Sequence, residues 1–159
     1  MLWEAGQRHG IVAAGRSAFN SLRLEKGYRA AGVDVTTEHD PDEAGLGFAV
    51  KPGKPGEYVG AAALAAKGEP ARRLVPLLLD DPAHVVLGKE PVWHAGAPAG
   101  YVTSAAYGYT IDASIAYAWL PAPAAEPGTP VHVEYFGERL PAVVAAEPLF
   151  DPEMKRIKA

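Results

Sequence analysis

Short apolar runs separated by turn-forming residues fill the second half of the chain, and they constrain its fold more than any other feature. Between residues 72 and 145 these runs are "RRLVPLLLDD", "HVVLG", "VWH", "YVTS", "SIAYAWL", "VHVEYF" and "RLPAVVA". In "SIAYAWL", Ile115, Tyr117 and Trp119 alternate with smaller residues, which is typical of a strand with one buried face. The turn-forming sequences "AGAPAG" and "GE" join neighbouring runs into hairpins. We therefore expect a small closed antiparallel barrel.

The part of the chain before Pro70 shows helical patterns followed by irregular ones. Residues 2–9, 16–26 and 57–67 are predicted helices. The second of them ends at Gly27, a residue type favoured just beyond a helix C-terminus. "LGFAVK", at residues 46–51, predicts a short strand. Helices followed by a run of strands indicate the α+β class.

Charge and composition exclude several classes of function. The chain has no cysteine, so disulfides, thiolate zinc sites and cysteine nucleophiles are excluded. Its net charge is −4 and its basic residues do not cluster, which argues against nucleic acid or an anionic membrane as a partner. The longest apolar stretch, "LVPLLL", is far too short to cross a bilayer, and the N-terminus lacks the pattern of a signal peptide. We expect a soluble, cytoplasmic protein.

The segment "TTEHDPDEAG", residues 36–45, contains enough carboxylate and imidazole groups for a metal site or an acid–base pair. Its polar residues are Glu38, His39, Asp40, Asp42 and Glu43. They are adjacent in a stretch that contains Gly and Pro, so their side chains diverge instead of converging, and their spacing does not fit an EF-hand. We therefore interpret the segment as a structural connector, with no metal site.

The remaining residues indicate no reaction centre by themselves. The histidines fit no HExxH pattern, and no serine lies in a GxSxG sequence. Aromatic residues are able to stack on a flat ligand, but more often they fill the interior of a barrel. The aromatic residues in question are Tyr101, Tyr107, Tyr109, Tyr117 and Trp119. No catalytic residue is assigned on this basis.

Long strings of the sequence resemble a known family. "HGIVAAGRSAFNSLRLEKGYR", "LDDPAHVVLGKEPVW", "GYVTSAAYGYTIDASIAYAWLP" and "VEYFGERLPAVVAAEPLFDPEMKR" closely resemble the C-terminal part of dimethylglycine and sarcosine oxidoreductases. The C-terminal half of these flavoproteins is similar to the glycine-cleavage T-protein, an aminomethyltransferase. The resemblance runs from about Leu2 to Lys155.

The resemblance implies a division of the chain into three parts. Residues 1–30 are expected to be a remnant of the folate-binding domain, and residues 31–70 a connector with one helix. Residues 71–159 are expected to form a six-stranded Greek-key barrel. The implied cofactor is tetrahydrofolate, bound in a channel of which the barrel forms one wall. Glu43 and its neighbours then cap turns in the connector.

The family's functional residues carry over only in part. Its catalytic Asp, and the Tyr and Glu that hold the pterin ring, lie upstream of every matched string, so no catalytic residue is expected in this chain. FAD is implied only for the family's N-terminal part, whose GxGxxG sequence is not found here. Phe19 stands where T-proteins carry a ligand-contacting Arg. Together with Tyr28, Tyr107 and Tyr109, it is a candidate for lining the folate channel.

Two interpretations follow from the resemblance. In the first, the chain completes a folate site with a partner that carries the flavin and pterin-binding segments. This predicts an apolar face on the helices of residues 1–30 that is larger than a lone domain tolerates. In the second, the chain is a non-catalytic barrel that serves as an interaction module and has no affinity for folate. An independent aminomethyltransferase is disfavoured, because the family's acid and pterin-binding residues are absent.

Overall fold

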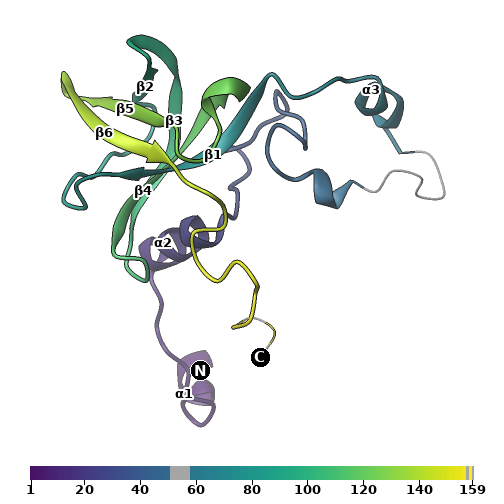
Figure 1. Cartoon of the computed structure of the whole chain (residues 1–159). Helices are drawn as coiled ribbons and strands as arrows, with labels where there is room; N and C mark the ends of the chain where they lie inside the picture. Colours follow the sequence, from purple (N-terminus) through teal and green to yellow (C-terminus); the bar gives the residue numbers. More distant parts are fainter. Residues whose placement is uncertain (51–57, 157, 159) are drawn as a thin grey trace.

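The chain folds into a β-barrel preceded by short helices, which confirms the predicted α+β class (Figure 1). This computed structural model describes residues 1–50, 58–156 and 158. Before the barrel come α1 (Leu2–Gln7), α2 (Arg16–Lys26), the 3-10 helix η1 (Gly47–Ala49) and α3 (Ala61–Ala65). The barrel consists of β1 (Arg72–Leu79), β2 (Pro91–His94), β3 (Ala97–Gly108), β4 (Ala113–Pro121), β5 (Pro130–Tyr135) and β6 (Glu138–Val144). A second 3-10 helix, η2 (Ala122–Ala124), follows β4.

All strand pairs of the barrel are antiparallel, and the sheet closes on itself. The order is β1-β4-β3-β2-β5-β6, and β6 pairs with β1 through Leu77, Leu78 and Leu79. The three consecutive strands β2, β3 and β4 lie side by side, with β1 beside β4, which is the Greek-key arrangement. Because the sheet is closed, each of these strands has a hydrogen-bonded neighbour on both sides.

The strand β4 is buried on both faces, which corrects the prediction of a single buried face. Its small residues, Ala116 and Ala118, belong to the barrel core together with residues such as Leu77 and Val133. Tyr117 and Trp119 lie on the outer face, in a second core with Leu24, Leu74 and Ile115. The two aromatic residues therefore fill the space between the barrel and the N-terminal part, and they do not fill the barrel interior.

The helix α2 has the bounds that the sequence predicts and covers the outer face of β3 and β4 (Figure 1). It ends at Gly27, whose φ of 79° lies in the left-handed region that favours glycine. Ser21, Leu24 and Glu25 face the barrel, whereas Phe19 and Leu22 face away from it. By contrast, α1 has no buried residue and stands apart from the barrel (Figure 1).

Two predicted strands do not form. The run "HVVLG" is irregular, because the Leu87 and Gly88 N–H groups bond to the Glu90 carboxylate and not to a neighbouring strand. "LGFAVK" contains the 3-10 helix η1, held by local bonds such as Ala49 N–H to Leu46 O (2.9 Å), and its last residue lies outside the described part.

The predicted helices around α2 are longer than the observed ones. The first ends at Gln7 and not at residue 9. The third, α3, covers only Ala61–Ala65, and the start of its predicted range lies outside the described residues. In the described part of the chain, no helix is both long and apolar enough to cross a membrane.

Candidate functional site

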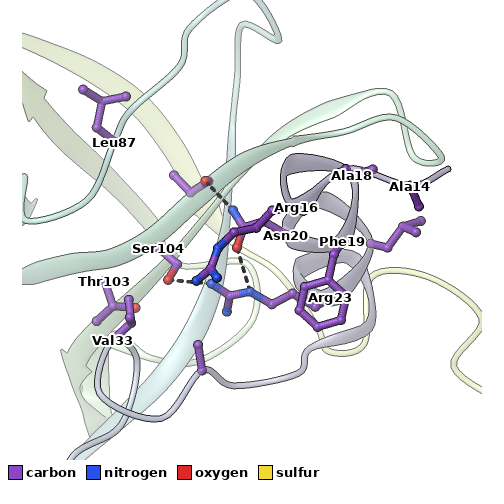
Figure 2. Close-up of a pocket in the computed structure, with 14 residues that line it drawn as sticks. Ala14, Arg16, Ala18, Phe19, Asn20, Arg23, Val33, Leu87, Thr103 and Ser104 are labelled. Carbon is purple, nitrogen blue, oxygen red and sulfur yellow. Dashed lines mark hydrogen bonds between the residues drawn. The ribbon is translucent and has the colours of Figure 1, made fainter.

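A hollow of about 660 Å³ lies between α2 and β3 (Figure 2). On one side it is lined by α2 residues, among them Arg16, Phe19 and Asn20. Thr103 and Ser104 of β3 line the opposite side, where Leu87 stands in Figure 2. Its volume lies within the usual range for small-molecule sites.

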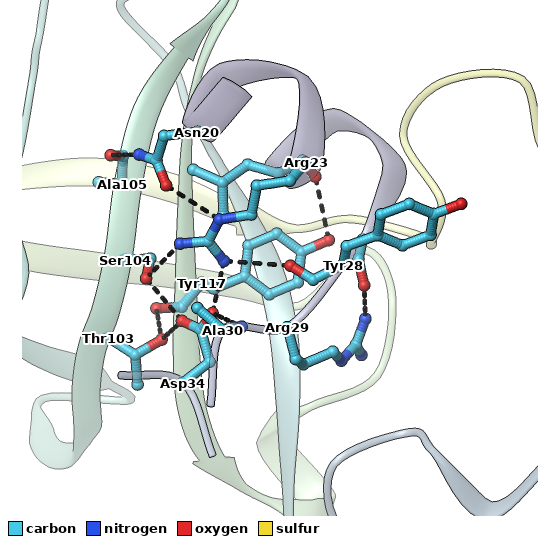
Figure 3. Close-up of polar contacts among 12 residues, drawn as sticks. Asn20, Arg23, Tyr28, Arg29, Ala30, Asp34, Thr103, Ser104, Ala105 and Tyr117 are labelled. Atoms are coloured by element: carbon cyan, nitrogen blue, oxygen red, sulfur yellow. Dashed lines mark hydrogen bonds and ion pairs between the residues drawn. The ribbon is translucent and has the colours of Figure 1, made fainter. Parts of the chain in front are cut away.

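Polar side chains held by Arg23 form the floor of this hollow (Figure 3). The Arg23 guanidinium donates from Nε to Asn20 Oδ1 (2.9 Å) and from Nη2 to Ser104 Oγ (2.8 Å). Its Nη1 donates to the Tyr28 carbonyl (3.1 Å) and to Asp34. Because Arg23 is buried, these bonds fix Asn20 and Ser104 in the floor of the hollow.

Asp34 is the centre of the same network, although the connector around it has no regular structure. Its carboxylate accepts hydrogen bonds from Thr103 Oγ1 and Ser104 Oγ (both 2.6 Å) and from the Ala30 N–H (2.8 Å). Burial raises the pKa of Asp34, but these three hydrogen bonds and the charge of Arg23 outweigh burial and lower the pKa below its ordinary value. Asp34 is therefore a structural anion and not a proton donor to a ligand.

The rim of the hollow is apolar and exposed. Phe19, Leu22, Val33 and Leu87 line it, and their exposed fractions are 69%, 59%, 47% and 74%. A second hollow of about 250 Å³ shares Phe19 and Leu22 with the first and continues to Tyr28. A third, of about 540 Å³, shares Tyr28 with the second. The three hollows thus adjoin one another along the outer side of α2, and their exposed apolar side chains, Phe19, Leu22 and Tyr28, form what we call the apolar track.

The structure separates the four predicted channel residues into two pairs. Phe19 lines the first and second hollows, and Tyr28 lines the second and third. Tyr107 and Tyr109 lie near the turn between β3 and β4, edge to face with ring centroids 5.0 Å apart, and they line none of the three hollows. A role for any of the four in a folate channel stays a prediction.

Sequence reasoning missed most of the residues that build the hollow, among them Arg16, Asn20 and Ser104. Arg16 and Asn20 are four residues apart in a predicted helix, so the sequence does indicate that their side chains lie on the same helix face. No local sequence pattern predicts that Ser104 lies next to α2, because Ser104 and Arg23 are 81 positions apart and meet only in the folded chain.

The polar segment 36–45 has structural contacts, as the sequence indicates. The Glu43 N–H donates to Asp40 Oδ1 (2.8 Å) and the Asp40 N–H donates to Glu43 Oε2 (3.2 Å), so the two side chains cap one turn reciprocally. The His39 ring stacks on Trp119 with centroids 4.1 Å apart. Within the described residues, no three His, Asp or Glu side chains are grouped so as to hold a metal ion.

The sequence is similar to known protein families and to individual proteins. Residues 72–151 match the glycine cleavage T-protein C-terminal barrel domain, and residues 1–54 match the GCVT N-terminal domain. The chain is 41% identical over 158 residues to the mitochondrial dimethylglycine dehydrogenase of Homo sapiens, covering 98% of this chain and 18% of that protein. It is 36% identical over 152 residues to an aminomethyltransferase of Synechococcus sp. (strain CC9902), covering 94% of this chain and 41% of that protein.

A solved structure shows the same fold. The crystal structure of the glycine cleavage system aminomethyltransferase T from Bartonella henselae matches with a TM-score of 0.76 and 28% identity. The match covers 83% of this chain and 38% of that one. The chain thus spans about a fifth of the human dehydrogenase and about two fifths of the two aminomethyltransferases.

Proposed function

The chain belongs to the glycine cleavage T-protein family of folate-dependent one-carbon enzymes, and from this premise we propose that it is a C-terminal module whose α2 and barrel form one wall of a tetrahydrofolate site. The observation that carries the proposal is the hollow between α2 and β3, with its apolar rim and polar floor. A ligand that combines flat aromatic rings with polar groups requires both kinds of surface.

The residues around the hollow fit tetrahydrofolate. Phe19 offers an exposed ring for stacking, and Asn20 and Arg16 offer hydrogen-bond donors. When bound, tetrahydrofolate accepts a one-carbon unit. The contribution of this chain is to bind the cofactor and to exclude water, which hydrolyses a free iminium.

Proton transfer is left to other residues. Of the described side chains that line the hollow, none is a carboxylate or an imidazole, the groups that most often act as general acids and bases. Asp34 lies just behind the floor, but its four donors hold it as a carboxylate. In the proposed site, the acid–base group therefore comes from the upstream part of the family fold.

The same upstream part is the proposed occupant of the apolar track along α2. Phe19, Leu22 and Tyr28 form the track and are exposed. The polar network holds the opposite side of α2 against the barrel. Continuous exposed apolar surface of this kind marks interaction sites. The GCVT N-terminal domain matches this chain only over residues 1–54, so the remainder of that domain is the natural cover, in the same polypeptide or on a partner chain.

A second candidate function is that of a non-catalytic interaction module. It is favoured by the barrel, which is closed and whose interior apolar core contains no residue of α1 or α2. A barrel with a core of its own is a suitable scaffold for an interaction surface. The two functions differ in whether the chain binds folate.

Titration of the purified 159-residue protein with tetrahydrofolate under anaerobic conditions tests the proposed site. We expect saturable one-to-one binding in isothermal calorimetry. Phe19→Ala is expected to weaken binding roughly twofold to tenfold, because a stacked aromatic pair contributes about 0.5–1.5 kcal/mol. Phe136→Ala, which removes another highly exposed phenyl ring, is the control and leaves affinity unchanged. No heat up to millimolar ligand, from a folded protein, supports the interaction module.

Leu22→Glu tests the proposed cover of α2. Human dimethylglycine dehydrogenase shortened by the segment that matches this chain is co-expressed with it, and the complex is measured by light scattering. We expect a complex with the wild-type chain and its loss with Leu22→Glu, because a carboxylate is then buried in an apolar interface. Leu22 is 59% exposed, so the variant itself stays folded. Equal complex formation by the variant, or none by the wild type when both proteins are soluble, contradicts the proposal.

A further inference from the structure

The hollow between α2 and β3 carries a positive charge that nothing in the described structure neutralises. Arg16, the first residue of α2, lines the hollow, is exposed, and has no ion pair or hydrogen bond with another described residue. The second arginine at the hollow, Arg23, is neutralised by Asp34. No aspartate or glutamate is among the described residues that line the hollow.

The acceptor groups of the floor are already in use. Asn20 Oδ1 accepts a hydrogen bond from Arg23 Nε. The Ser104 hydroxyl accepts from Arg23 Nη2 and donates to Asp34. The Thr103 hydroxyl donates to the same carboxylate, and both hydroxyl residues are buried. A ligand therefore finds few side-chain acceptors at this end of the hollow.

Two donor groups at the hollow, in contrast, make few or only long hydrogen bonds with the described residues. Because its oxygen is held by Arg23, the amide group of Asn20 is oriented, and its nitrogen makes only a long contact of 3.4 Å with the Ala105 carbonyl. Arg16 lies one helical turn before Asn20 on the same face of α2, so the guanidinium and the amide reach the same region (Figure 2). A guanidinium beside an amide N–H is a suitable pair of donors for a carboxylate.

We propose that the α2 end of this hollow is a carboxylate subsite, in which Arg16 and Asn20 bind a carboxylate group of the ligand. The inference rests on the proposed folate site and deepens it. Tetrahydrofolate has its carboxylates on the glutamate tail, at the opposite end from the pterin. The tail therefore lies against Arg16 and Asn20, with Phe19, which lies between them in the sequence, beside the adjoining aromatic ring.

Two probes that divide the cofactor test this assignment. p-Aminobenzoyl-L-glutamate has the carboxylates without the pterin, and 6-methyltetrahydropterin has the pterin without carboxylates. Binding of each is followed by NMR shifts of the Arg16, Asn20 and Ser104 amides up to millimolar probe. Arg16→Gln is expected to weaken p-aminobenzoyl-L-glutamate binding roughly tenfold, since a hydrogen bond to a charged group is lost. Asn20→Asp, which keeps the acceptor for Arg23 but repels an anion, is expected to weaken it at least as much.

The controls separate the subsite from a general effect. Arg8→Gln removes an exposed charge outside the hollow and leaves both probes unaffected. Neither Arg16→Gln nor Asn20→Asp changes the binding of 6-methyltetrahydropterin. The subsite is overturned if p-aminobenzoyl-L-glutamate produces no shifts, if Arg16→Gln leaves its affinity unchanged, or if both probes weaken equally.

The outcome also distinguishes this inference from the proposed function. If p-aminobenzoyl-L-glutamate binds and depends on Arg16 while tetrahydrofolate does not bind, the carboxylate subsite stands and the folate role fails. If tetrahydrofolate binds with the same affinity to the wild type and to Arg16→Gln, the folate role stands and the subsite is overturned.

Discussion

Asp34→Ala is expected to lower the free energy of unfolding by about 3–5 kcal/mol, the loss typical of breaking a buried ion pair by removing one partner. The substitution leaves Arg23 buried without a counter-charge and removes the acceptor of Thr103, Ser104 and the Ala30 N–H. Urea denaturation at neutral pH, followed by circular dichroism, measures the change. A loss of this size is a large share of the total stability of an ordinary domain.

The exposed carboxylate of Asp81 provides the matched control. Its side chain is 54% exposed, it lies 3.9 Å from His84, and its Oδ1 accepts one hydrogen bond, from the Ala83 N–H (2.8 Å). Asp81→Ala is expected to lower stability by at most about 1 kcal/mol, the usual contribution of a single hydrogen bond. If Asp34→Ala were as mild as Asp81→Ala, the network would not hold α2 on the barrel.

The dependence of stability on pH gives an independent readout of Asp34. Because its pKa in the folded protein is lowered, the folded state favours the carboxylate more than the unfolded state does. This contribution is complete above the unfolded pKa of about 4 and is lost as the pH falls through the lower, folded pKa. Stability of the wild type is therefore expected to fall below about pH 4, and Asp34→Asn, which cannot ionise, is expected to lack that part of the decrease.

Local sequence patterns predict the barrel and α2 well, because their causes are local. The alternation in "SIAYAWL" requires only neighbouring residues, and Gly27 ends α2 through its own backbone conformation. The same patterns failed at "HVVLG", because the Glu90 side chain competes for its backbone N–H groups. The same patterns predicted only one buried face for β4. The other face is also buried, because α2 and the connector cover it.

The candidate site was less predictable, because long-range packing assembles it. Asp34 is one acidic residue in a connector without periodicity, yet it bonds to Thr103 and Ser104 some seventy positions away. Ser104 is fixed by Arg23 across 81 positions. The family resemblance predicted a folate channel along the chain, but it related only Phe19 to a ligand contact of the family, at a position where T-proteins carry an arginine. Arg16, which has no hydrogen bond or ion pair with another described residue, was not related to any functional residue of the family.

Trp119→Ala is expected to destabilise the protein by about 3–5 kcal/mol, the range for removing a buried aromatic side chain. Trp119 is only 2% exposed and joins three parts of the chain. Its ring stacks on His39, the Arg72 guanidinium lies 5.2 Å from the ring centroid, and its Nε1 donates to the Asp34 carbonyl (2.9 Å). Chemical denaturation followed by circular dichroism measures the loss.

Two further tryptophan variants separate the contributions of the Trp119 side chain. Trp119→Phe keeps an aromatic face for His39 but removes the donor to Asp34, so it is expected to lose about 1 kcal/mol for the hydrogen bond, plus a smaller packing loss. Trp3→Ala, on α1 where the ring is 54% exposed, is the control and is expected to change stability by less than about 0.5 kcal/mol. Hydrogen exchange adds a local test, because loss of the stacked ring should free the Thr36 N–H that His39 Nδ1 holds at 3.1 Å. Unchanged exchange at Thr36 in Trp119→Ala would show that segment 36–45 is held by its own turn contacts, with Asp40 and Glu43 sufficient to fix it without the barrel.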